Sequence, residues 1–158
     1  MRTIKITLIT FLAAFYLYSS YTGGIKVTAF TYQMMHANIF HLLCNCWCIY
    51  SVINDRLINR YIIIPVIFIS GMAAYIAVSP ALATIGFSGA LLAMTGINIA
   101  QVPTRRNWIT ISALFALWFF IPVISFGVHL ASFTTGLCTG YSVILFRRYD
   151  RKRNIRGK

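Results

Sequence analysis

Acidic side chains are almost absent from this sequence. Its 158 residues contain two aspartates, Asp55 and Asp150, and no glutamate. Both aspartates fall in polar stretches, so no carboxylate lies within an apolar segment. A hydrolytic zinc site commonly takes its general base from a carboxylate, and the HExxH pattern is missing as well. The sequence therefore disfavours metal-dependent hydrolysis, and we expect neither a metal nor another cofactor.

Charge of either sign is scarce. Only 10% of the residues are charged and 59% are hydrophobic, and the mean hydropathy is +0.76. A soluble protein needs far more charge to cover its surface. The length suits a single domain, and the composition predicts an integral membrane protein.

The few charges are mostly basic, which gives a formal net charge of +12. Seven of the 14 basic residues lie after Phe146, and the others flank apolar runs. This distribution is typical of a topology signal and of a contact with anionic lipids. We therefore expect the lipid bilayer as a partner, with anionic lipids at the basic tail, and no nucleic acid.

Four cysteines lie within apolar runs, where disulfides are not expected. On a helix, positions 44, 46 and 48 spread over a wide arc and do not converge as metal ligands should. We interpret them, together with Cys138, as small apolar packing residues.

Polar turns divide the chain into six apolar runs. Their approximate ranges are 6–21, 36–53, 61–78, 88–100, 108–121 and 128–146, with a polar turn at 54–60, an uncharged loop at 79–87 and a stop at Pro122. The first run could pass for a signal peptide, but it is long and has no clean cleavage site. The predicted fold is an all-α membrane protein, a bundle of six transmembrane helices over residues 1–146, with a basic cytoplasmic tail over 147–158.

The basic residues also predict the orientation of this bundle. With six spans, 13 basic residues fall on one side and Lys26 alone on the other. The positive side is cytoplasmic. Both termini are therefore expected in the cytoplasm, and the expected location is the inner (cell) membrane of a prokaryote.

Ionisable and amide side chains inside a membrane are costly and mark functional sites. Ser88 and His41 each lie 13 residues before a polar boundary, which places them roughly 20 Å above the inner face, and His129 lies roughly 26 Å above it. Three predicted helices thus bring a serine and two histidines to a similar depth.

The helix that begins at Ser88 is too short to cross a full membrane. It must begin inside the bilayer, where its N-terminus favours a developing negative charge. Stripes of small residues on this helix and on the last one would let the two approach closely and bring His129 toward Ser88. These stripes are Gly89, Ala93, Gly96 and Ala100, and Ser132, Gly136 and Gly140.

His41 and Asn45 are four residues apart and share a helical face. His36 lies about 140° away from His41 in a regular helix, so we expect it at the helix start, bracing the loop. Three histidines could alternatively bind zinc, and the missing carboxylate disfavours that reading.

These residues form three motifs that resemble those of the rhomboid intramembrane serine proteases, over nearly the whole chain. The motifs are His36-x4-His41-x3-Asn45, Gly86-Phe87-Ser88-Gly89, and His129 followed by small residues at 132, 136 and 140. The sequence departs from the family's pattern at Leu92, often tyrosine, and at Ser132, usually glycine. The first loop also lacks the family's Trp-Arg pair.

The resemblance implies an intramembrane serine protease that cleaves transmembrane proteins near the outer face. In that reading Ser88 is the nucleophile and His129 the general base. His41, Asn45 and the Ser88 backbone amide would stabilise the oxyanion, and His36, Gly86 and Gly89 would be structural. Substrates would enter laterally between the second and fifth helices, past Phe40, Cys44, Phe115, Trp118 and Phe119, unless these residues only face lipid.

Two other functions stay open. A catalytically inactive rhomboid-like protein would bind membrane proteins and assist their turnover. A small transporter or channel would use the same polar residues to line a pathway, although no inverted repeat supports it.

Overall fold

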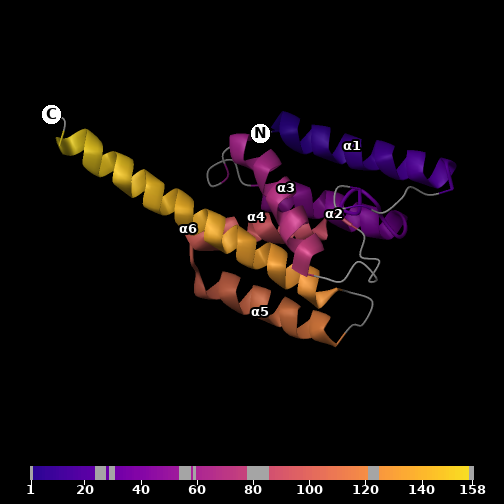
Figure 1. Cartoon of the computed structure of the whole chain (residues 1–158). Coiled ribbons are helices and arrows are strands. Elements are labelled where there is room, and N and C mark those ends of the chain that lie inside the picture. Colours follow the sequence, from indigo (N-terminus) through magenta and orange to yellow (C-terminus); the bar gives the residue numbers. More distant parts are fainter. Residues whose placement is uncertain are drawn as a thin grey trace.

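The computed structural model describes residues 2–23, 28, 31–53, 58, 60–77, 86–120 and 125–156. In this part of the chain the fold is all-helical, with six α-helices and no strand (Figure 1). The helices are α1 (Arg2–Tyr21), α2 (Ile39–Val52), α3 (Arg60–Ala77), α4 (Ser88–Gln101), α5 (Arg105–Phe119) and α6 (Phe126–Arg156). The expected α-helical class is confirmed.

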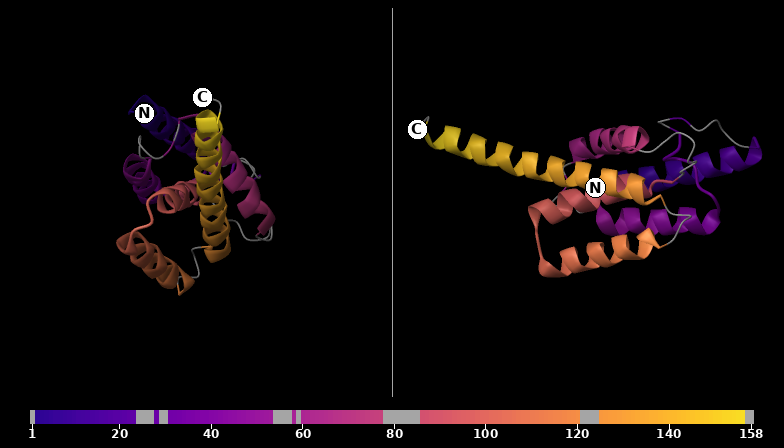
Figure 2. Two further views of the ribbon diagram at one scale, coloured as in Figure 1. Left: turned by 90° about the vertical axis from the view of Figure 1, so that its left-hand side faces the viewer. Right: turned by 60° about the horizontal axis from the view of Figure 1, so that its bottom comes forward.

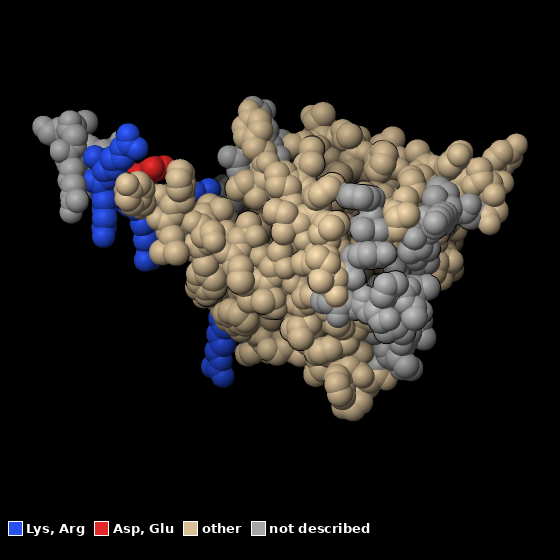
Figure 3. Space-filling model, viewed as in Figure 1, with Lys and Arg blue, Asp and Glu red and all other residues tan. Residues whose placement is uncertain are grey.

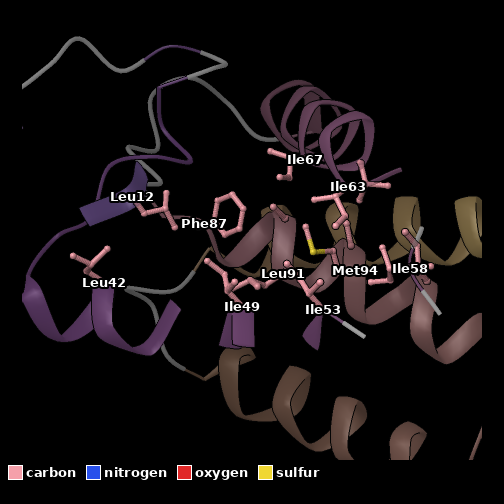
Figure 4. Packing of buried hydrophobic residues seen from close by; sticks show 14 residues of the cluster. Leu12, Leu42, Ile49, Ile53, Ile58, Ile63, Ile67, Phe87, Leu91 and Met94 are labelled. Carbon is pink, nitrogen blue, oxygen red and sulfur yellow. The ribbon is translucent and has the colours of Figure 1, made fainter. Parts of the chain in front are cut away.

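Helix α4 is the centre of the molecule. Ten of its 14 residues are buried, from Gly89 to Ala100, and none is exposed. One side of α4 packs with α1, α2 and α3 in the larger hydrophobic cluster, and Leu92 and Ile99 pack in a second cluster with α5 and α6. Figure 4 shows the Phe87 ring, just before α4, between Leu12 of α1 and Ile67 of α3. The first residue of α4, Ser88, is thus carried by the best-packed element.

Helices α4 and α6 make the most extensive contact in the bundle. A Cβ on Gly96 would lie 2.5 Å from the Phe133 carbonyl oxygen, and one on Gly136 would fall on the Ala93 carbonyl. Only glycine permits backbones to approach so closely. The small-residue stripes read from the sequence therefore meet each other.

The segment before α2 is hydrogen-bonded to α3 and to the turn that precedes α4. The Tyr32 hydroxyl donates to the Gly71 carbonyl over 3.2 Å, and the Gln33 amide donates to the Ile67 carbonyl over 3.2 Å. The Gly86 amide donates to the Tyr32 carbonyl over 2.8 Å. Burial raises the pKa of Tyr32 to about 12, so its hydroxyl stays protonated and can donate. The first loop, which lacks a Trp-Arg pair, is anchored through Tyr32 and Gln33.

Side-chain caps set two helix starts. Asn38 is the N-cap of α2, and its side chain accepts a hydrogen bond from the His41 amide. Thr104 is the N-cap of α5, and its side chain accepts from the Asn107 amide. Both residue types are favoured N-caps. As a result α2 begins at Ile39 and α5 at Arg105, three residues earlier than 108. Most of the predicted turn at 54–60 and of the loop at 79–87, and Pro122, lie outside the described residues.

Helix α6 is longer than predicted. It continues without a break past Phe146 to Arg156, because residues 141–156 include no glycine or proline and are rich in helix-forming arginine. Figures 1 and 2 show this extension projecting beyond the other helices. In Figure 3 the basic side chains cluster on and near this projecting end, and the rest of the face is almost uncharged.

Two of the described helices are long and apolar enough to cross a membrane: α1, which lies near the N-terminus, and α6 over Phe126–Arg153. Helix α2 and the Tyr61–Ala73 part of α3 are apolar but shorter. The number of spans and the sidedness of the termini remain predictions.

Candidate active site

Ser88 and His129 meet where α4 begins beside α6. The Ser88 Oγ lies 2.9 Å from His129 Nε2, across 41 residues of sequence. His129 is buried, and Ser88 is half-buried. A serine hydroxyl bonded to an imidazole is the arrangement from which the imidazole can take the hydroxyl proton.

The Ser125 carbonyl fixes the tautomer of His129. It lies 2.7 Å from His129 Nδ1 and also accepts the backbone amide of the same residue over 3.2 Å. Because a carbonyl oxygen can only accept, Nδ1 carries the proton. Nε2 is then the unprotonated nitrogen and accepts from the Ser88 hydroxyl. The chain thus orients its histidine with a backbone carbonyl, where many serine hydrolases use a carboxylate.

His41 and Asn45 border the turn that leads into Ser88. A Cβ on Gly86 would lie 2.7 Å from His41 Nε2 and 3.7 Å from Asn45 Nδ2, so both side chains lie against this glycine. Asn45 Nδ2 is buried and has no hydrogen-bond partner among the described residues. An unpaired buried donor is costly, and it leaves Asn45 free to donate to a ligand at this turn.

The N-terminus of α4 presents its own donors at the same place. Phe87 is the N-cap residue, is fully buried, and offers no side-chain hydrogen bond to the first turn. The first amides of a helix have no partner within the helix and carry a partial positive charge. The start of α4 therefore favours a negative charge beside Ser88.

His36 lies before the start of α2, so the angle of about 140° from His41 that a regular helix would give does not apply to it. Its ring packs edge to face on the His41 ring, with centroids 5.1 Å apart, and its Nδ1 lies 3.1 Å from the Met34 carbonyl. Burial, and next the neighbouring His41, lower the pKa of His36 to about 4. His36 is therefore neutral at physiological pH and supports both His41 and the loop.

The position that is often tyrosine in the family is Leu92 on α4. The aromatic ring that lies on His129 instead comes from α5. The Trp118 and His129 ring centroids are 4.8 Å apart and the ring planes differ by 35°. Leu92 is buried in the cluster of Ile99, Ile111 and Phe133, against which Trp118 also packs. Ser132 is fully buried, and its Oγ lies 3.0 Å from where a Cβ on Gly89 would stand.

The structure therefore gathers Ser88, His129, His41, Asn45 and Gly86 around the start of α4. No three His, Cys, Asp or Glu side chains converge as metal ligands anywhere in the described ranges. The exposed side chains of Phe40, Cys44 and Phe119 do not contribute to this cluster.

Comparison with known families identifies the domain that carries these residues. A model of the Rhomboid domain matches residues 24–146, which is most of the chain and includes every residue of the site. The chain belongs to the rhomboid family. A search of curated proteins returned no significant match. Rhomboid proteins are membrane proteins, and the family includes both serine proteases and inactive relatives.

Four contacts in this rhomboid are not predicted from its sequence, and they involve Ser125, Tyr32, Gln33 and Trp118. The Ser125 carbonyl follows from helical geometry once the start of α6 is known, because it lies four residues before His129. Tyr32 and Gln33 lie in an irregular loop whose contacts have no period. Trp118 was assigned to substrate access or to lipid, and only the rotation of α5 shows that it faces His129.

Proposed function

We propose that this rhomboid is an intramembrane serine protease in which Ser88 is the nucleophile and His129 the general base. The observation that carries the proposal is the 2.9 Å contact between Ser88 Oγ and His129 Nε2, with His129 Nδ1 held on a carbonyl. A serine in a membrane helix that served only packing would have no need of an oriented, unprotonated imidazole nitrogen.

In the first step Ser88 Oγ attacks the carbonyl carbon of the scissile peptide bond, and the hydroxyl proton moves to His129 Nε2. The carbonyl oxygen becomes an oxyanion. Asn45, His41 and the Ser88 backbone amide are the proposed donors to this oxyanion, and the N-terminus of α4 adds its dipole.

The tetrahedral intermediate then collapses. The C–N bond breaks, and His129 gives its proton to the leaving amine, which leaves an ester on Ser88. Water attacks this ester as His129 Nε2 takes its proton. The bond between the acyl carbon and Ser88 Oγ then breaks, and His129 returns the proton to Ser88 Oγ, which releases the new carboxyl end and restores the hydroxyl. The Ser125 carbonyl stabilises the imidazolium formed in both half-reactions, because it accepts from Nδ1 throughout.

The proposed substrates are transmembrane proteins, cut near the outer face of a prokaryotic inner membrane. Peptide bonds within a helix are shielded by the helix's own hydrogen bonds, so small or helix-destabilising residues near the cut should favour cleavage. The proposed topology has six spans with both termini in the cytoplasm, and residues 147–158 facing anionic lipids. It rests on the 13 basic residues of one side.

The decisive experiment is fluorophosphonate labelling of the purified protein in detergent, together with cleavage of model transmembrane substrates. Ser88→Ala should abolish both. His129→Gln should lower turnover by at least about 10³-fold, and Asn45→Ala by about 10²-fold. Ser70→Ala is the matched control, since Ser70 is fully buried and its hydroxyl donates, among the described residues, to the Ile67 carbonyl of its own helix.

Wild-type protein that behaves like Ser88→Ala across several substrates would refute the catalytic proposal. The inactive, substrate-binding alternative would then be the better description. Full activity in His129→Gln would refute the role of His129 as general base but not the protease activity itself.

A further inference from the structure

The rings of α5 and α6 form a continuous contact, here called the aromatic seam. It consists of Phe115, Trp118 and Phe119 on α5 and of Phe126, His129 and Phe133 on α6. On α5, Trp118 and Phe119 lie three and four residues after Phe115, and on α6 the three rings are spaced by three and then four residues, so each set lies along one helical face. His129 is the middle ring of the α6 set.

The seam is the main attachment of α5, which packs chiefly against α6. Phe115 contacts Phe126 and Phe133 at centroid distances of 5.7 and 5.4 Å. It also meets the Trp118 ring edge to face at 5.7 Å. These distances lie within the range in which aromatic pairs attract each other. Trp118 is therefore held by its neighbours and presents a fixed face to His129.

The three contacts of the His129 ring are of different kinds. Ser125 and Ser88 bind its two nitrogens, at 2.7 and 2.9 Å, and both of these contacts lie at the edge of the ring. Edge contacts position the nitrogens, but any tipping of the ring about the Cβ–Cγ bond turns both nitrogens away from these partners. Trp118 covers a face of the ring, at a centroid distance of 4.8 Å, and a face contact opposes that tipping.

We propose that Trp118 is a positioning residue for the protease reaction, which orients the His129 ring from α5. This inference rests on the proposed function. The indole face also faces the imidazolium that forms when His129 takes the serine proton, and a cation over an indole face is stabilised. The contact between Trp118 and His129 thus both attaches α5 to α6 and orients the general base.

The kinetic test compares Trp118→Leu, Trp118→Phe and Trp108→Leu on a model transmembrane substrate. Trp118→Leu should lower kcat about 3- to 10-fold with little change in KM, and Trp118→Phe should restore most of the loss. Trp108→Leu is the matched control, because Trp108 joins α5 to Phe133 of α6, with centroids 6.4 Å apart, without contacting His129. Trp108→Leu should leave kcat unchanged.

The second test is spectroscopic and requires no turnover. The sequence has three tryptophans, so the double substitution Trp47→Phe/Trp108→Phe leaves Trp118 as the only one. Its fluorescence should be quenched as the imidazole beside it is protonated, with the same midpoint as the acid limb of activity, and His129→Gln should remove this titration. Within the described ranges, Trp118 makes ring contacts with Phe115 and His129, and His36 and His41 pack edge to face on each other.

The results separate three outcomes. Fluorescence that does not change with pH, or unchanged kcat in Trp118→Leu, would overturn the positioning role. Faster turnover in Trp118→Leu, or a change in KM alone, would also overturn it and make Trp118 a residue of the substrate path. Wild-type protein that titrates but is never labelled by the fluorophosphonate would instead refute the protease proposal, and the positioning role with it.

Discussion

At the scale of single residues, Gly86 is constrained twice. Its φ of 126° lies in a region that side chains rarely adopt, and a Cβ there would stand 2.5 Å from His41 Cε1. The conformation and the space therefore both require glycine. The amide of the same residue is held on the Tyr32 carbonyl, so the turn cannot shift away from His41 without losing a hydrogen bond.

We expect Gly86→Ala to lower turnover by about 10²–10³-fold, the cost of removing one oxyanion donor, because the new methyl group displaces His41. Turnover on a model substrate measures this. Gly23→Ala is the control: Gly23 also has positive φ, 75°, but a Cβ there meets no atom of the described residues within 4 Å. It should cost about 1 kcal/mol of stability and no activity. Equal activity losses in the two variants would show that backbone strain, and not His41, is responsible.

His36 should make stability depend on pH. Its pKa is lowered to about 4 in the folded chain, against 6.5 for an ordinary histidine. The unfolded chain therefore binds the proton more readily, so stability is fully present above about pH 6.5 and is lost as the pH falls toward 4. Thermal unfolding in detergent should show Tm falling over this window.

The matched variant is His36→Gln, which keeps a polar group near the Met34 carbonyl but cannot titrate. The Tm of this variant should be lower than that of the wild type at neutral pH, and it should change less between pH 6.5 and 4. A slope as steep as that of the wild type would assign the pH dependence to another group.

The polar residues of the site could be predicted from the sequence because polar groups are rare in its apolar runs. Ser88 and His129 stand out there, and the small-residue stripes predict that their helices meet. Trp118 does not stand out among the 15% of residues that are aromatic. Whether an aromatic ring faces lipid or a histidine depends on the rotation of its helix, and a membrane supplies no polar face from which to read that rotation.

At the scale of elements, the contact between α4 and α6 sets the distance from Ser88 to His129. We expect Gly136→Ala to cost about 1–3 kcal/mol, because its Cβ falls on the backbone of Ala93, which cannot move aside as a side chain can. Activity should fall as well, since α6 carries His129. Tm and turnover of the same preparation measure the two effects.

Thr134→Ala is the matched control on α6, since Thr134 is exposed and lies two residues away. It should change stability by less than about 0.5 kcal/mol. Gly136→Ala as stable and active as Thr134→Ala would mean that α4 and α6 do not need their close approach.

The helices themselves were largely predictable, because long apolar runs separated by polar turns leave little choice of element. The boundaries that differ have local causes. Thr104 caps α5 earlier than its apolar run begins. Helix α6 continues past its apolar run because a helix ends at glycine, proline or a cap, and not where hydrophobicity ends.

At the scale of the whole molecule, the basic residues predict the orientation in the membrane. In Figure 1, α1 begins and α6 ends toward the same end of the molecule, where Figure 3 shows the basic side chains. We expect reporters fused at either terminus or after Arg106 to lie in the cytoplasm, and one inserted beside Lys26 to lie outside. Fluorescent-protein and alkaline phosphatase fusions at each site distinguish the two sides.

A pair of complementary reporters controls for fusions that fail to fold, because each site should give a signal with one reporter only. Active phosphatase at the C-terminus would contradict the predicted orientation. It would also move the site to the opposite face of the membrane.

The unequal packing of α4 and α5 implies an order in which the molecule fails on heating. Ser88 belongs to the helix with no exposed residue, whereas Trp118, the ring that faces His129, belongs to a helix whose only buried residue is Ile111. Local opening begins where few contacts are buried, so α5 should come loose while α4 is still in place. In the proposed protease, activity would then be lost reversibly, well below the temperature at which the bundle melts, with Ser88 in place and His129 misaligned.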